Sequence, residues 1–106
     1  MINYERDDLL TDFGKTTLKD RYLLPEETSP QEGFMRAAKA FSDNDEMAQR
    51  IYDYASKLWF MFSTPVLSNA GSKRGMPISC FLNYVGDSRE GLTGHYTENA
   101  WLASVG

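Results

Sequence analysis

A four-residue helix start, Ser29-Pro30-Gln31-Glu32, is the feature that most constrains how this chain folds. Serine is a preferred N-cap residue, and glutamate three residues later completes a capping box. Proline suits the first helical position because its missing N–H would have no partner there. Apolar side chains then recur at the three- and four-residue spacing of a helix, at Phe34, Ala37, Ala38 and Phe41. The stretch predicts a helix that ends near Ser42–Asn44.

A second helical repeat follows directly. Asp43 is a suitable cap for it, and Glu46 places a carboxylate near the positive end of the helix. One face of the repeat is apolar and consists of Met47, Ile51, Tyr54, Ala55 and Leu58. Residues 59–62 continue it with apolar side chains on every side, which is typical of a helix end buried by other elements. Pro65 is expected to end this helix, because the residue before a proline is disfavoured in the helical conformation.

The remaining segments carry weaker signals. Residues 1–28 are mixed in polarity and have no clean period, so we interpret them as an extended arm with short helical turns. Asparagine and glycine within residues 64–75 are typical of a loop. Residues 78–85 form a short apolar run that predicts a strand, and a further helix is expected from about Arg89 to Ser104. The chain is thus predicted to be mainly helical with one strand.

Composition argues against several classes of function. Of the 106 residues, 42% are hydrophobic and 13% aromatic, which is enough for a packed core. The net charge of −4 argues against non-specific binding to nucleic acid or to an anionic membrane surface. No apolar run approaches the length of a membrane-spanning helix. A single cysteine cannot form an internal disulfide, which favours a reducing, cytoplasmic compartment.

Cys80 and His95 are the only thiol and the only imidazole in the chain. One cysteine and one histidine do not make a metal cluster, so no metal site is predicted. A lone cysteine in an apolar run is most often a small buried hydrophobe, and the pair Lys73-Arg74 is interpreted as a solvated loop pair. On this interpretation the chain is a non-catalytic helical interaction module, and Cys80 is buried and inert.

The segment from Thr64 to Leu92, TPVLSNAGSKRGMPISCFLNYVGDSREGL, resembles the large catalytic subunit of ribonucleotide reductase. In that family a Thr-Pro or Ser-Pro step precedes a Ser/Asn/Gly loop, then Ser-Cys-Phe at the first barrel strand, then an Asp-Ser pair. The flank RDDLLTDFGKTTLKDRYLLP resembles the helical N-terminal region of members without a regulatory ATP-cone, and TENAWLASVG resembles the segment before the glycine-rich loop. The resemblance implies a ten-stranded α/β barrel behind a helical domain. Residues 1–63 would be the helical region, and residues 64–106 the start of the barrel.

The resemblance assigns roles to five residues. Cys80 corresponds to one of two cysteines that become a disulfide as the ribose 2′-hydroxyl leaves as water, and it is expected on a buried strand beside the sugar. Thr64 and Ser79 match positions that hold the substrate by hydrogen bonds. Asp87 and Ser88 match the start of the allosteric site, where a nucleotide effector binds across a dimer interface. Either of these two residues is also a suitable cap for the helix that follows.

The same resemblance implies that cofactors and partners come from outside the chain. The radical generator is a di-metal small subunit or adenosylcobalamin, the effectors are deoxynucleotides or ATP, and the reductant is thioredoxin or glutaredoxin. The substrate is a ribonucleoside di- or triphosphate, and the catalytic subunit forms a homodimer. The second redox cysteine and the radical cysteine lie outside these 106 residues, so activity is expected to need the remainder of the catalytic subunit. Two origins stay open, a naturally split enzyme and a truncated single chain.

Overall fold

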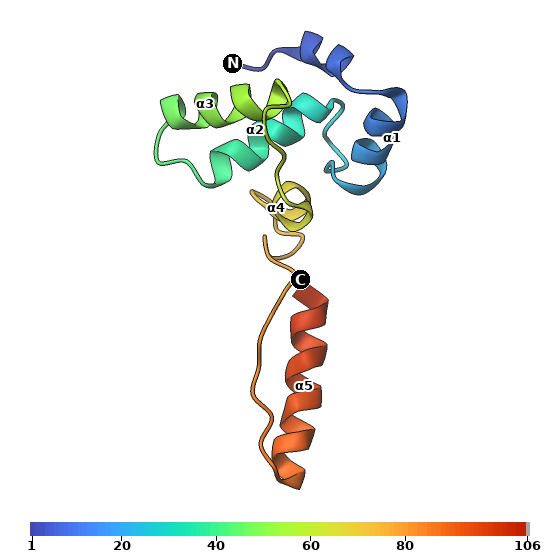
Figure 1. Cartoon of the computed structure of the whole chain (residues 1–106), viewed down its shortest axis with the longest axis vertical. Helices are drawn as coiled ribbons and strands as arrows, with labels where there is room; N and C mark the ends of the chain where they lie inside the picture. Colours follow the sequence, from blue (N-terminus) through green and yellow to red (C-terminus); the bar gives the residue numbers. More distant parts are fainter. Residues whose placement is uncertain (106) are drawn as a thin grey trace.

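The computed structural model describes residues 1–105, which contain five α-helices, one 3-10 helix and no strand. In chain order the elements are η1 (Tyr4–Leu9), α1 (Asp12–Arg21), α2 (Pro30–Ala40), α3 (Asp45–Ser56), α4 (Thr64–Asn69) and α5 (Arg89–Val105). Helices α1 to α4 gather into a head, from which an extended segment and α5 project as an arm (Figure 1). The molecule is accordingly elongated, with extents of 57 × 31 × 24 Å.

Helix α2 is the centre of the head, and its predicted capping box is present. The Ser29 hydroxyl accepts the Gln31 N–H at 3.2 Å, and the Glu32 carboxylate accepts the Ser29 N–H at 3.1 Å. Two alanines on α2 are almost fully buried, and small side chains let neighbouring helices approach closely. The core cluster draws on α1 to α4 and comprises Leu18, Phe34, Met35, Ala37, Ala38, Tyr52, Leu67 and Ala70.

A network of buried and partly buried hydrogen bonds connects the N-terminal segment to the head. The Tyr52 phenol is fully buried, donates to Gln31 Oε1 at 2.8 Å and accepts the Asn3 N–H at 2.9 Å. Gln31 and Ser29 in turn donate to the two carboxylate oxygens of Asp7, at 2.9 and 2.7 Å. Residues 1–28 are therefore more regular than the extended arm that the sequence predicted, because η1 packs against α2 and α1 adds three helical turns.

Helix α3 is shorter than predicted, and a different residue caps it. Asn44, not Asp43, is the N-cap, and its side chain accepts the Met47 N–H at 2.8 Å. The prediction that Pro65 ends this helix is wrong, since α3 ends at Ser56.

The cause is a turn at Leu58, which has a left-handed conformation with φ of +64°. Its N–H donates to Ala55 O, and the Trp59 N–H donates to Tyr54 O, both at 3.0 Å. These two hydrogen bonds form a Schellman motif, which satisfies the last carbonyls of a helix and ends it. Beyond the turn, Phe62 packs beside Phe34 with ring centroids 6.5 Å apart.

The predicted loop over residues 64–75 is wrong in its first half, which forms α4. Pro65 lies in the first turn of α4, and Ser63 before it is extended and accepts the Leu67 N–H at 3.0 Å. A proline that cannot continue one helix is well suited to open the next. Leu67 is only 2% exposed, so burial of this side chain in the core also stabilises the short helix.

The predicted strand over residues 78–85 is absent from the described residues. The segment is extended, but a strand needs a neighbour for its backbone hydrogen bonds, and residues 1–105 offer none. It runs instead beside α5, to which Asn83 is joined by a 2.8 Å hydrogen bond from its side chain to Asn99 Oδ1 (Figure 1). The predicted final helix is confirmed, since α5 begins at Arg89 and extends one residue past Ser104.

Candidate functional site

A polar cleft of about 490 Å³ lies where the end of α1, helix α4 and the end of α5 meet. Thr64 enters it from the first position of α4, and Ser79 enters it from the extended segment. The Thr64 hydroxyl lies 3.3 Å from the Tyr22 phenol oxygen, so a second hydroxyl group orients it. The lining residues are Arg21, Thr64, Pro65, Ser68, Asn69, Arg74, Ser79, Ser104 and Val105. We call this space the Thr64–Ser79 cleft.

A tight turn after α4 brings the extended segment back to the cleft. Gly71 makes the turn with a left-handed φ of +74°. The Asn69 side chain then donates to Met76 O at 2.8 Å, and the Met76 N–H donates to Val105 O at 2.7 Å. These contacts hold the start of the extended segment between α4 and the end of α5, and Ser79 then lines the same cleft as Thr64.

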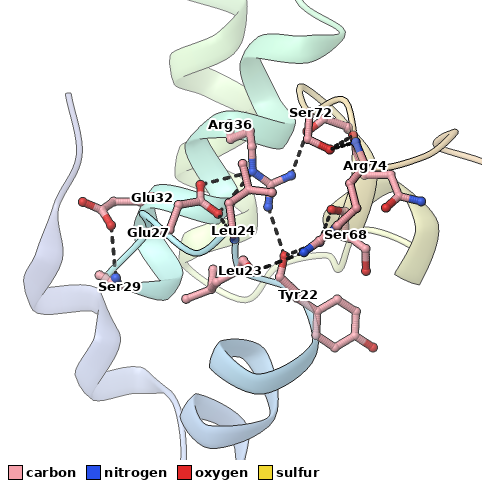
Figure 2. A network of polar contacts seen from close by, with 12 residues as sticks. Tyr22, Leu23, Leu24, Glu27, Ser29, Glu32, Arg36, Ser68, Ser72 and Arg74 are labelled. Carbon is pink, nitrogen blue, oxygen red and sulfur yellow. Dashed lines mark hydrogen bonds and ion pairs between the residues drawn. The ribbon is translucent and has the colours of Figure 1, made fainter.

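A buried ion pair fixes α4 to the rest of the head. Arg36 of α2 donates from Nε to Glu27 Oε2 at 3.1 Å, and the two side chains are only 9% and 10% exposed. The same guanidinium donates to Ala70 O at 2.7 Å. It also donates to Tyr22 O at 3.2 Å (Figure 2). Arg36 thus joins the ends of α4 and α1, the two elements that bring Thr64 and Tyr22 together.

Arg74 also joins the end of α1 to α4, and the sequence alone did not reveal this role. Its guanidinium donates to Tyr22 O at 3.2 Å, to Leu23 O at 3.4 Å and to Ser68 O (Figure 2). Lys73 and Arg74 are both exposed, as a solvated loop pair should be, but Arg74 has these structural contacts in addition. Nothing local in the sequence marks this role, because the acceptors are backbone carbonyls and two of them, Leu23 O and Tyr22 O, are 51 and 52 residues away in the chain.

Cys80 is exposed and is a free thiol in this chain. It follows Ser79 directly but does not line the cleft. Side chains on an extended backbone alternate between opposite sides, so neighbouring residues face different surroundings. The expected buried strand around Cys80 is not formed by residues 1–105. The structure brings Thr64 and Ser79 together and leaves Cys80 apart from them.

Asp87 and Ser88 lie at the start of α5. The Ser88 hydroxyl accepts the Gly91 N–H at 2.9 Å, and Ser88 O accepts the Leu92 N–H at 2.9 Å, so Ser88 caps the helix. Asp87 is exposed in the bend before it. An open hollow of about 750 Å³ runs along α5, and neither Asp87 nor Ser88 lines it; its walls are Arg89, Glu90, Thr93, Gly94, Thr97, Glu98, Trp101 and Leu102.

Two further features are absent from residues 1–105. No group of three or more histidine, cysteine, aspartate or glutamate side chains is arranged to hold a metal ion. Among the helices of this range, none is both long and apolar enough to cross a membrane.

The fold and the cleft define an all-helical domain with a polar site between helix ends. The family model for the all-alpha domain of ribonucleotide reductase matches residues 8–75. The chain therefore belongs to the ribonucleotide reductase large-subunit family and corresponds to the N-terminal portion of that subunit.

Comparison with individual relatives leads to the same family. The ribonucleoside-diphosphate reductase large subunit of Invertebrate iridescent virus 6 is 38% identical over 106 residues, which cover 100% of this chain and 11% of that protein. The large subunit of Invertebrate iridescent virus 3 is 42% identical, over 99% of this chain and 17% of that protein. The alpha subunit of the Helicobacter pylori enzyme (strain 26695) is 33% identical, over 99% of this chain and 14% of that protein.

The chain is much shorter than these relatives and spans between a tenth and a fifth of their length. They favour a part of a reductase over the non-catalytic interaction module. The comparisons give the family of the chain, while the roles of single residues rest on the cleft and on the motif.

Proposed function

We propose that this chain forms one wall of the substrate site of a ribonucleotide reductase and contributes Cys80 as one of its two reducing thiols. One observation carries the proposal: Thr64 and Ser79, the two residues that the motif assigns to the substrate, line the same cleft. They lie on different elements, so their convergence is a property of the fold and not of sequence proximity. Membership of the large-subunit family supports the same function.

The proposed chemistry uses each of these residues in a defined way. The hydroxyl groups of Thr64 and Ser79 each donate one hydrogen bond and accept others, which suits them to hold ribose or phosphate oxygens. The 2′-hydroxyl leaves as water, and Cys80 with a second thiol from outside this chain supplies the two electrons by forming a disulfide. An external dithiol, from thioredoxin or glutaredoxin, then reduces that disulfide and becomes oxidised itself.

The remainder of the catalytic subunit completes the site on this proposal. Residues 1–63 are the helical region, and residues 64–106 belong to the start of an α/β barrel built mostly from the rest of the subunit. The exposed thiol of Cys80 and the exposed apolar side chains around it support this, because they leave a surface for the rest of the subunit to cover. The radical comes from a di-metal small subunit or from adenosylcobalamin, and the enzyme acts in the cytoplasm.

Helix α5 is the proposed contact with a second catalytic subunit. Its side chains include exposed aromatics, with Tyr96 at 73% and Trp101 at 70% exposure. Large exposed aromatic side chains are typical of interface surfaces. Asp87 and Ser88, at the positive end of this helix, are the proposed contacts for a deoxynucleotide or ATP effector.

The test is reduction of a ribonucleoside diphosphate by this chain assembled with the remainder of the large subunit, a radical source and a dithiol. Cys80→Ser keeps the size of the side chain but cannot form a disulfide. We expect it to bind the substrate with unchanged affinity and to lose deoxynucleotide formation by several orders of magnitude. A Cys80→Ser enzyme that keeps its activity would contradict the redox role.

Thr64 is tested with a matched pair of variants in the same assay. Thr64→Val removes the hydroxyl at nearly constant volume, and Thr64→Ser retains it. We expect Thr64→Val to raise KM about tenfold, in line with the loss of one hydrogen bond to a charged or polar ligand group, and Thr64→Ser to stay near the parent value. Equal KM values for the two variants would remove Thr64 from the substrate site.

A further inference from the structure

The Thr64–Ser79 cleft is positively charged. The charged side chains on its wall are Arg21 and Arg74, and no described carboxylate lines it. This is notable in a chain whose net charge is −4. Five of the other lining residues carry hydroxyl or amide groups that can donate hydrogen bonds, namely Thr64, Ser68, Asn69, Ser79 and Ser104. A cleft of this composition favours an anionic, oxygen-rich ligand.

The two arginines are not equivalent. Arg74 already donates to the carbonyls of Tyr22, Leu23 and Ser68 with three of its five N–H groups, so its position is fixed by the protein. Arg21 is the last residue of α1 and is exposed. Within residues 1–105 it has neither an ion pair nor a side-chain hydrogen bond. The guanidinium of Arg21 therefore has its donors free at the wall of the cleft.

We infer that Arg21 binds the phosphate of the ligand that occupies the Thr64–Ser79 cleft, and that Arg74 shapes the cleft without contacting that phosphate. A guanidinium matches phosphate geometry with two parallel N–H···O contacts, and a phosphorylated nucleotide presents such oxygens. The inference rests on the proposed function, because it takes the ligand at Thr64 and Ser79 to be a nucleotide. It adds a residue from the α1 end, outside the motif that the sequence analysis used.

The first experiment measures binding to the whole chain and uses inorganic pyrophosphate as the probe. Backbone amide signals of Thr64, Ser68 and Ser79 are followed by NMR during the titration. We expect saturable shifts for the parent chain and an affinity roughly three- to tenfold weaker for Arg21→Gln, the effect of losing one exposed charge-assisted contact. Arg50→Gln is the matched control, because Arg50 is also exposed but lies on α3 away from the cleft.

Each outcome decides the inference. An affinity reduced by Arg21→Gln but not by Arg50→Gln supports it. Equal losses in both variants would show a general charge effect and overturn it, and so would a parent chain without saturable shifts. Arg21→Lys separates charge from geometry, since a lysine ammonium keeps the charge but not the planar fork. We expect its affinity to lie between those of the parent and Arg21→Gln.

A second experiment separates failure of the inference from failure of the proposed function. In the assembled reductase, Arg21→Gln should raise KM by the same factor and leave kcat unchanged. If Thr64→Val raises KM and Arg21→Gln does not, the substrate site stands and the role of Arg21 is wrong. If pyrophosphate binds through Arg21 but neither variant alters KM, the anion site is real and is not the substrate site.

Discussion

Gly71 is the residue on which the geometry of the cleft most directly depends. Gly71 makes the tight turn after α4 with φ of +74°. A Cβ placed there would lie 2.9 Å from Arg36 Cγ and 3.3 Å from Arg36 O. Arg36 donates to Ala70 O and to Tyr22 O, so a shift of Arg36 disturbs the contact between the ends of α4 and α1, the elements that bring Thr64 and Tyr22 together.

We therefore expect Gly71→Ala to lower the free energy of unfolding by about 1–3 kcal/mol, from left-handed strain plus the contact with Arg36. Urea unfolding of the chain measures this change. Gly94→Ala is the matched control, because a Cβ at Gly94, inside α5, meets no atom within 4 Å. Alanine is the better helix former, so Gly94→Ala should cause no loss. Equal stability of Gly71→Ala and the parent chain would mean that neither the left-handed φ nor the contact with Arg36 constrains the turn after α4.

At this scale the sequence indicates only part of the site. Thr64, Ser79 and Cys80 belong to a contiguous motif and could be singled out from it. Tyr22 and Arg36 could not, because their side chains contact groups far away in the chain, and Arg21 could not, because only the fold places it at the cleft. The guanidinium of Arg36 and Ala70 O, for example, are 34 residues apart. Such contacts leave no local pattern in the sequence.

At the scale of elements, the N-terminus of α2 carries the clearest electrostatic feature. Glu32 accepts the Thr28 N–H at 2.6 Å and the Ser29 N–H at 3.1 Å, and the Tyr4 phenol donates to its other oxygen at 3.2 Å. The hydrogen bond from the Thr28 backbone is the main cause that holds the pKa of Glu32 below its usual 4.5. These bonds favour the ionised carboxylate and so couple the cap to pH.

The sign of the pH dependence follows from this shift. A carboxyl group whose pKa is lowered on folding stabilises the fold fully above about pH 4.5, and this contribution is lost as the pH falls through the lowered folded value. We expect the unfolding free energy of the chain to fall in acid, and Glu32→Gln, which does not titrate, to show a flatter profile between pH 5 and 3, roughly the range of carboxyl titration. Glu26→Gln, in the exposed turn before α2, is the control. Identical profiles for all three proteins would show that the cap is not pH-coupled.

Element boundaries were predictable only where a local signal decides them. The capping box fixed the start of α2, and the turn residues before Arg89 fixed the start of α5. The end of α3 was not predictable, because Leu58 adopts a conformation in which glycine would be expected. Helix α4 was missed because its six residues have little intrinsic helicity and depend on burial of Leu67.

At the scale of the whole molecule, the head and the arm differ in burial. Helix α2 has seven buried residues, whereas none of the 17 residues of α5 is buried. An exposed helix without tertiary packing is marginal in water, so the two parts should differ in local stability.

Amide hydrogen exchange of the chain should show this difference. We expect the amides of α5 to exchange much faster than those of α2, and residues 78–85 to exchange fastest, because they have few backbone hydrogen bonds. Addition of the remainder of the large subunit should then slow exchange in α5 and in residues 78–85. Equal protection of α2 and α5 in the chain alone would contradict the division into head and arm.

The sequence by itself determined the helical character of the chain, the start of α2, the extent of α5 and, through the Thr64–Leu92 motif, the family. These are local or contiguous signals, and capping, helical periodicity and motif spacing act within a few turns. The tertiary structure alone decided that residues 78–85 lack a strand partner, that α3 ends early, and that Arg21 meets Thr64 and Ser79 at one cleft. Each of these depends on groups distant in the chain, whose contacts are fixed by packing around α2 and by backbone carbonyls that any residue could provide.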